Sequence, residues 1–254
     1  MERFDLVVIG AGAAGITAAR TAAALGARVA LADRGPLGGL CVNHGCVPKK
    51  ALVAAGRVHR LVSEAGGFGT VADAVRLDWD AVQQRQTAIV AALRPAAPDL
   101  ERRGIRVAIG TARFTDPHIV EVDGRSLGAE HFVIAAGSRP VIPDVPGQEL
   151  LITSDQLLFL PAFPPSLTFI GAGPVALELA SAFSDFGSRV TVLARDAEIL
   201  PHVDADVARN LRKRMEQRGV TFRLQSTVTA LAKAPEGVRV GFDSAGMANE
   251  MTSR

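Results

Sequence analysis

The chain has 254 residues, a formal net charge of +2 and 48% hydrophobic residues, enough apolar material for one large domain or two ordinary ones. This composition excludes collagen, coiled-coil and disulfide-rich secreted proteins, and it argues against a disordered chain. The 24 Arg and 4 Lys are interspersed with acidic residues, so no basic stripe for nucleic acid is present. The chain contains no Tyr, which excludes catalysis by a phenol of its own. Without a leader-like start or an apolar run of about 18 residues, we expect a cytoplasmic protein with no membrane segment.

The first part of the chain predicts a strand–helix–strand unit followed by a loop and two helical regions. We expect strands at residues 4–9 and 28–32, with a helix between them over residues 12–25 that Gly26 ends. The glycine-rich residues 35–50 carry both cysteines. Helices are expected over residues 51–64 and 78–103, the second of them interrupted by prolines at 95 and 98.

Strands then alternate with turns up to a proline-rich connector, after which a second strand–helix cycle begins. The first group of strands is expected at residues 105–109, 112–114, 119–122 and 131–134. Residues 138–147 form the connector and the best candidate for a domain boundary. The second cycle has strands at 167–170, 189–193, 220–224 and 238–242 and helices at 173–186 and 204–218. Residues 243–254 are polar and predict no element.

The strongest organisational signal is an internal duplication. The loop Gly10-Ala11-Gly12-Ala13-Ala14-Gly15 recurs as Gly171-Ala172-Gly173-Pro174-Val175-Ala176, each copy lying between an apolar strand and a helix. Such a turn directs backbone N–H groups and the positive end of a helix at one spot, which suits a pyrophosphate. The first glycine makes the turn, the second admits the phosphate, and the third position must be small. One copy could arise by chance in a Gly- and Ala-rich chain, but two copies with matched spacing predict two dinucleotide sites.

The two copies differ at the position expected to meet the ribose. Counting 23 residues on from Gly10 gives Asp33, a carboxylate able to bond the ribose 2′-OH. The same count from Gly171 gives Ala194, followed by Arg195. Because a carboxylate repels a 2′-phosphate and Arg attracts one, the second site favours NADP over NAD. The alternative is that Arg195 is an ordinary surface residue.

The only two cysteines, Cys41 and Cys46, are so close in sequence that a disulfide between them would close only a small loop and could not stabilise a fold of this size. Their spacing is unlike the usual zinc half-site, no second cysteine pair exists, and we expect no metal site. Two inert thiols are a further alternative. The pair follows the Gly38-Gly39 turn, precedes a helix, and lies near Lys49 and Lys50, all of which favour a thiolate. A disulfide that opens and re-forms is therefore the favoured interpretation.

The cysteine segment Gly38-Gly39-Leu40-Cys41-Val42-Asn43-His44-Gly45-Cys46-Val47-Pro48-Lys49-Lys50 resembles the active-site segment of class I pyridine nucleotide–disulfide oxidoreductases. That family includes dihydrolipoamide dehydrogenase, glutathione reductase and mercuric reductase. The resemblance extends to about residue 242 and also covers residues 111–114, 134–140 and 171–178. The second cycle looks most similar to the mercuric reductase branch.

The resemblance implies roles for individual residues. The first loop would hold FAD with Gly10, Gly12, Gly15, Asp33, Arg34, Gly39, Lys50, Ala112 and Gly137. The second loop would hold NAD(P)H with Gly171, Gly173, Ala176 and Arg195. Hydride would pass to the flavin and electrons on to a Cys41–Cys46 disulfide, with Cys46 against the flavin and Cys41 facing the substrate. Lys50 and Glu178 stand where the family has a lysine near the flavin and its carboxylate partner, although Glu178 could also be an ordinary helix-surface acid.

Several positions depart from the family pattern. The family usually has Thr where Leu40 and Ala136 stand, and Glu where Asp33 stands. Pro174 replaces a Tyr of glutathione reductase-like members. Pro201 replaces an Arg frequent in NADPH-dependent relatives, which weakens the preference for NADP. The family also continues into a second FAD segment and a dimerisation domain that supplies a His–Glu pair. Neither is found in residues 1–254, so we expect weak FAD retention and little reductase turnover from this chain alone.

Together these features predict an α/β protein with two Rossmann-like dinucleotide-binding domains, C-terminally truncated. Residues 1–147 are expected to form an incomplete FAD-binding domain with the cysteine pair, and residues 148–254 a nearly complete NAD(P)-binding domain. The expected function is NAD(P)H-dependent, FAD-linked reduction of a small-molecule disulfide or a thiol-bound metal ion. The family is homodimeric, but its dimer domain is not seen here. The alternatives are a diaphorase-like flavoprotein that does not use its cysteines and an inactive, truncated nucleotide-binding relative.

Overall fold

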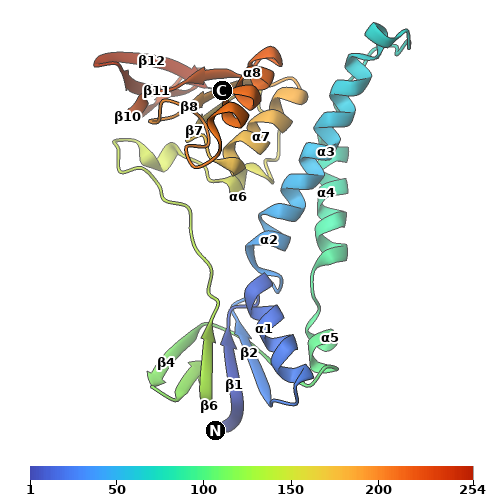
Figure 1. The fold of residues 1–254 in the computed structure, drawn as a ribbon, viewed down its shortest axis with the longest axis vertical. Coiled ribbons are helices and arrows are strands. Elements are labelled where there is room, and N and C mark those ends of the chain that lie inside the picture. Colours follow the sequence, from blue (N-terminus) through green and yellow to red (C-terminus); the bar gives the residue numbers. More distant parts are fainter. Residues whose placement is uncertain (254) are drawn as a thin grey trace. The chain divides into compact units, whose positions relative to one another are not determined.

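A computed structural model describes residues 1–253 of the chain, which separate into two compact units (Figure 1). Unit 1 comprises Met1–Pro48 and Thr87–Arg139, and unit 2 comprises Lys49–Gln86 and the residues from Pro140 onward. Helices α3 (Cys46–Ser63) and α4 (Trp79–Leu93) each contribute residues to both units. Each unit is described by itself below.

Unit 1 is built on a six-stranded sheet with the order β3-β2-β1-β6-β5-β4. Strands β1, β2, β3 and β6 run parallel, while β4 and β5 complete an antiparallel meander with β6. In Figure 1, β2, β1 and β6 lie side by side, as their register requires. The bounds are β1 (Glu2–Ile9), β2 (Val29–Asp33), β3 (Ile105–Ile109), β4 (Ala112–Asp116), β5 (Ile119–Val122) and β6 (Arg125–Ile134).

Helices α1 (Ala13–Ala24) and α5 (Ala97–Glu101) pack on this sheet. The alanine-rich sequence of α1 favours a helix, and Gly26, which has a φ of 89°, ends it. Ile16 and Ala19 of α1 and Leu100 of α5 join one apolar cluster with β1, β2 and β3. A separate cluster links β1 and β2 to apolar residues of β5 and β6.

Unit 2 repeats the strand–loop–helix–strand pattern with a three-stranded parallel sheet, β7-β8-β9, next in sequence to an antiparallel meander, β10-β11-β12. Trp79 lies at the centre of its core, in contact with the rings of Phe163, Phe183 and Phe186. The indole N–H donates to the carbonyl of Leu160 at 2.9 Å. The elements are η1 (Ala65–Phe68), η2 (Gln148–Leu150), α6 (Ser154–Leu157), β7 (Ser166–Ile170), α7 (Pro174–Asp185), β8 (Arg189–Leu193), α8 (Ala205–Gln217), β9 (Thr221–Arg223), β10 (Ser226–Ala234), β11 (Gly237–Ser244) and β12 (Met247–Ser253).

The expected α/β class with two similar parallel-sheet units is confirmed, and some boundaries need correction. Helix α3 begins at Cys46 rather than at residue 51. Pro48 is compatible with this start because the backbone N–H groups of the first helical turn have no partner within the helix, so the N–H that proline lacks is not missed. The prediction of no element after residue 242 is wrong, since β12 pairs with β11 throughout its length; Arg254 lies outside the described residues. Strand β10 and helix α6 were not predicted. Among residues 1–253, no helix combines the length and apolar character needed to cross a membrane.

Candidate functional site

The first glycine loop joins β1 to α1, and backbone contacts leave no room for a Cβ at its first and third glycines. Gly10 has φ of 105°, and a Cβ there would lie 2.2 Å from the carbonyl oxygen of Ala135. A Cβ on Gly15 would lie 1.8 Å from the carbonyl oxygen of Gly10. Gly12 is the N-cap of α1 and offers no side chain to the first helical N–H groups. Those groups and the positive helix end therefore suit an anion.

The cavity beside this loop lies at the carboxyl ends of the parallel strands of unit 1, where open α/β sheets bind their ligands. Its volume is about 360 Å³. Five residues predicted to bind the first cofactor line it together: Gly10, Asp33, Arg34, Ala112 and Gly137. Thr111, Ala136, Ser138 and Arg139 add polar and small groups to the same wall. These five residues come together from four separate segments of the chain, whereas the other predicted residues, Gly12, Gly15, Gly39 and Lys50, are not among the lining residues of this cavity.

Asp33 ends β2 with both carboxylate oxygens bonded to the backbone. Its Oδ2 accepts the N–H of Ala11 in the glycine loop, and its Oδ1 accepts the N–H of Gly35, each at 2.5 Å. The predicted contact with a ribose hydroxyl would use the lone pairs that remain. Because it also braces the glycine loop, Asp33 has a structural role that sequence reasoning did not assign.

The cysteine segment comprises the short helix α2 and the start of the long helix α3, which are joined by a tight turn. Cys41 lies in α2 (Gly39–Asn43), and Cys46 is the first residue of α3 and is exposed. A Cβ on Gly45 would lie 2.9 Å from the carbonyl oxygen of Leu40 and 3.3 Å from the Cα of Cys41, so this turn folds back onto α2. Both cysteines are thiols here. The fold therefore brings the turn before Cys46 against Cys41.

Asn43, between the two cysteines, is buried and fully engaged, a role the sequence did not reveal. Its side-chain N–H₂ group lies within 3.2 Å of the carbonyls of Pro36, Leu37 and Gly39, and its Oδ1 accepts from Arg94 Nε at 2.7 Å. These bonds hold α2 against the loop that precedes it. The residue type could have been a signal, because a buried amide in a short loop commonly satisfies backbone groups.

The cysteine segment is also held against the first glycine loop. The Gly38 N–H donates to the Ala11 carbonyl at 2.9 Å, and a Cβ on Gly39 would lie 2.5 Å from the Cα of Gly12. Gly39 has φ of 59°. The approach of the two backbones therefore requires glycine at position 39, whereas a Cβ on Gly12 would lie at an ordinary contact distance of 3.9 Å from the Gly39 Cα. The first glycine loop and α2 are thus in direct backbone contact.

In unit 2, Glu178 of α7 lies between two lysines at the start of α3. Both Lys49 Nζ and Lys50 Nζ bind its carboxylate. The Lys49 side chain is only 12% exposed, whereas that of Lys50 is 63% exposed. Burial raises the pKa of Glu178, but the hydrogen bonds and charges of the two lysines outweigh burial and bring that pKa below its ordinary value. Sequence reasoning assigned Lys50 to this pair and saw Lys49 only as a nearby cation.

Two further contacts hold α3 against α7. A Cβ on Gly56 would lie 2.9 Å from the carbonyl oxygen of Ala182, so the helices are in backbone contact at this point. Farther along, Arg60 Nε forms an ion pair with Asp185 Oδ1 at 3.1 Å. Burial raises the pKa of Asp185, and the charge of Arg60 opposes that rise.

The second glycine loop joins β7 to α7 and is far more open than the first. Gly171 has φ of 103°, matching the 105° of Gly10. Within the described residues, however, no atom lies within 4 Å of a Cβ placed on Gly171 or Gly173. Ala176, the counterpart of Gly15, lies within α7. The loop keeps the predicted shape and exposes its backbone.

Arg195 is exposed just beyond β8, and a second arginine lies on the neighbouring strand. Arg223 ends β9, and its carbonyl accepts the N–H of the buried Ala194 at 2.9 Å. Both arginines therefore stand at the carboxyl edge of this sheet. Sequence reasoning missed Arg223 because only strand pairing brings it next to Ala194.

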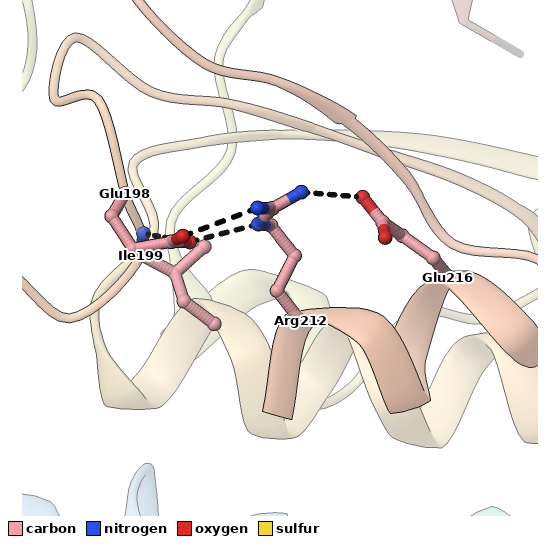
Figure 2. A network of polar contacts seen from close by, with 4 residues as sticks. All are labelled: Glu198, Ile199, Arg212 and Glu216. Carbon is pink, nitrogen blue, oxygen red and sulfur yellow. Dashed lines mark hydrogen bonds and ion pairs between the residues drawn. The ribbon is translucent and has the colours of Figure 1, made fainter. Parts of the chain in front are cut away.

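The loop after β8 is fastened to α8 by the network shown in Figure 2. Arg212 binds both oxygens of Glu198, at 2.9 and 3.2 Å, and donates to Glu216 at 3.0 Å. Glu198 also accepts the N–H of Ile199. The Arg212 hydrogen bonds lower the pKa of Glu198, and the Glu198 hydrogen bonds raise the pKa of Arg212. The network fixes the loop that carries Arg195.

Known proteins match this chain over nearly its whole length. Residues 4–247 match the family described as pyridine nucleotide-disulphide oxidoreductase. A glutathione reductase of Burkholderia cepacia is 38% identical over 231 residues, covering 91% of this chain and 51% of the relative. A dihydrolipoyl dehydrogenase of Acholeplasma laidlawii is 31% identical over 235 residues, covering 89% and 70%. A mercuric reductase of Lysinibacillus sphaericus is 33% identical over 243 residues, covering 94% and 44%.

The chain thus spans about half the length of the glutathione and mercuric reductases it matches. Relatives with three different names match at similar identity, so these values do not single out one branch. The match covers both glycine loops and the cysteine segment, and it agrees with the fold. The chain belongs to the pyridine nucleotide–disulfide oxidoreductase family.

Proposed function

We propose that the chain passes electrons from NAD(P)H through FAD to the Cys41–Cys46 pair and on to a disulfide or a thiol-bound metal ion. The observation that carries the proposal is the direct backbone contact between the first glycine loop and the cysteine segment at Gly12 and Gly39. A cofactor bound at this loop is thereby held next to the cysteine-bearing helix. Membership of the family supports the same assignment.

The first loop and its cavity fit the adenosine and pyrophosphate of FAD. Gly10 and Gly15 allow the loop to pack tightly on its own backbone, Gly12 presents no side chain to an approaching phosphate, and the uncapped start of α1 supplies N–H donors. In this proposal Asp33 and Arg34 border the ribose, and Ala112 and Gly137 border the rest of the adenosine. A bound flavin would supply a two-electron carrier between nicotinamide and disulfide.

The cysteines take up the electrons as a pair. Reducing a Cys41–Cys46 disulfide consumes two electrons and two protons and gives two thiols. Cys41, in its thiolate form, then attacks a substrate disulfide and releases one substrate thiol, and Cys46 resolves the mixed disulfide to release the other. The exposed position of Cys46 at the first turn of α3 favours negative charge there.

The Lys–Glu cluster would place a cation near the flavin, as the resemblance implies for Lys50 and Glu178. Burial favours Lys49 for this role, since Lys50 has most of its side chain in solvent. Glu178 holds both ammonium groups, so it acts as a positioning residue. A fixed cation at this place favours the reduced, anionic form of a flavin.

We propose that the second loop takes NADPH in preference to NADH. Ala194 removes the carboxylate that would repel a 2′-phosphate, and both Arg195 and Arg223 stand at the same edge of the sheet. Gly171, Gly173 and Ala176 would accept the pyrophosphate. Replacing both arginines with Met should weaken NADPH binding more than NADH binding, which fluorescence titration can measure.

The decisive experiment starts from oxidised protein kept in a concentration of FAD that saturates binding, as judged by a fluorescence titration, because weak retention is expected. Anaerobic NADPH should generate two new thiols per chain, counted with a thiol reagent, and none in C46S. If flavin is reduced but no thiols form, and C41S reduces quinones as fast as the parent, the diaphorase alternative is correct. A protein that takes up no flavin refutes the proposed function.

A further inference from the structure

Asn43 is the one polar side chain that is buried in the described part of unit 1, and it lies between the two cysteines. It is 2% exposed. A side-chain amide carries an N–H₂ donor group and an acceptor oxygen. Because burial separates Asn43 from water, both groups need partners in the protein, and losing a partner costs the desolvation of the group left behind.

The partners of Asn43 allow only one orientation of its amide. The carbonyls of Pro36, Leu37 and Gly39 can only accept, and all three face the N–H₂ group. The Nε–H of Arg94 can only donate, and it meets Oδ1 at 2.7 Å. Exchanging the oxygen and the nitrogen would set acceptor against acceptor at three contacts. Among residues 1–253, Arg94 alone donates to this oxygen, so it selects the orientation that ties α2 to the loop before it.

The chain beside Arg94 contacts α2 at a second place. Arg94 directly follows α4, and the next residue, Pro95, packs against Gly38, the N-cap of α2. A Cβ on Gly38 would lie 3.0 Å from Pro95 Cδ and 2.9 Å from the Cβ of Val42. Gly38 has φ of 103°. Residues 94 and 95 therefore contact both ends of the short helix that carries Cys41.

The link from Arg94 to the thiols runs through the end of α2. Residues two apart on a helix point about 200° apart, so the bond from Arg94 reaches α2 on the side away from Cys41. The turn after Asn43 then brings Gly45 against Cys41, before α3 begins at Cys46. If the amide lost its orientation, the end of α2 would be released and this turn would loosen.

We infer that Arg94 is a positioning residue for the Cys41–Cys46 pair, because its bond to the Asn43 amide holds the two thiols ready to form a disulfide. The inference rests on the proposed function, in which this pair opens and closes. Exchange with glutathione disulfide closes the protein disulfide, takes one hydrogen from each protein thiol and yields two molecules of glutathione. Since this equilibrium needs neither flavin nor nicotinamide, it tests Arg94 separately from electron transfer.

Two substitutions at Arg94 separate the hydrogen bond from the charge. Gln places its side-chain N–H₂ where Arg has Nε, whereas Met places a methyl group there, and both remove the positive charge. The 254-residue chain and its variants are equilibrated with glutathione buffers, and the protein thiols are counted after acid quenching. R94M should lower the equilibrium constant for disulfide formation at least about fivefold, while R94Q should stay within about twofold of the parent.

R103M is the matched control, because Arg103 is likewise exposed in unit 1 and lies outside the contacts of the cysteine segment described above. It should leave the equilibrium constant unchanged. Urea unfolding of each reduced variant checks the fold. R94Q decides even if R94M does not fold, since parent-like behaviour supports the hydrogen bond.

Three results would overturn the inference. The first is an equilibrium constant of R94M equal to that of the parent, including the case in which R94M only loses unfolding free energy, as for a merely structural contact. The second is a loss in R94Q as large as that in R94M, which would assign the effect to charge. The third is an equal loss in R103M, which would show that the effect is not specific to this position.

Discussion

The network of Figure 2 predicts that Arg212 couples far more strongly to Glu198 than to Glu216. The perturbation is a pair of double-mutant cycles that combine R212M with E198Q and R212M with E216Q. Methionine retains much of the aliphatic stem that packs on the surface, so the cycles isolate the polar contacts. Each cycle reports a coupling free energy rather than the whole cost of one substitution.

The structure sets the expected magnitudes. Arg212 makes two charge-assisted hydrogen bonds to Glu198, whose side chain is 24% exposed, and this predicts a coupling of about 1.5 kcal/mol. Its single bond to Glu216 is an i,i+4 pair with a carboxylate that is 42% exposed, which predicts about 0.4 kcal/mol. The Glu198 coupling should therefore be roughly three to four times larger.

Urea unfolding monitored by circular dichroism measures both couplings. Because the pKa of Glu198 is lowered in the folded state, its contribution to stability is complete above the ordinary value of 4.5 and is lost as pH falls through the lowered value. The cycle repeated in strong acid should accordingly approach zero. A Glu216 coupling as large as the Glu198 coupling, or a Glu198 coupling that survives in acid, would refute this reasoning.

Three further substitutions test contacts within unit 1 or within unit 2. G15A should cost about 3 kcal/mol of unfolding free energy, because its Cβ would lie 1.8 Å from the Gly10 carbonyl; a loss below about 1 kcal/mol in urea unfolding contradicts this. K49M should raise the pKa of Glu178, followed by NMR titration, more than K50M does, since Lys49 is the buried partner; equal shifts would show that burial does not matter. G56V should force α3 from α7 and raise that same pKa, so an unchanged titration with intact folding would disprove the role of this helix contact.

The repeated units could be predicted from the sequence because glycines mark the ends of their helices. Gly26 and Gly187 adopt φ of 89° and 103° just after their helices, the backbone shape for which glycine is the favoured residue. β12 was missed because its sequence carries no such signal. It is a sheet-edge strand with mostly exposed residues, so its apolar and polar side chains do not alternate. The start of α3 was placed too late because residues 35–50 were assigned as a whole to a glycine-rich loop, although their last five residues are helical.

The candidate site was predictable where it depends on local sequence and unpredictable where it depends on packing. The glycine loops, the cysteines and Asp33 are recognised from spacing alone. Lys49 and Lys50 are neighbours that point about 100° apart on a helix, so only the position of α7 decides which one is buried. Arg223 and Asn43 likewise gain their neighbours from strand pairing and from a turn, not from a motif.

The contact between Gly12 and Gly39 has a consequence for how substitutions combine. Because a Cβ on Gly39 would lie only 2.5 Å from the Gly12 Cα, the two backbones are in contact, and neither can move toward the other without displacing it. Any change that alters the curvature of the first glycine loop will therefore move the segment that bears the thiols, and the reverse is equally true. If this loop binds a nucleotide as proposed, adapting it to a different one would require redesigning both segments together.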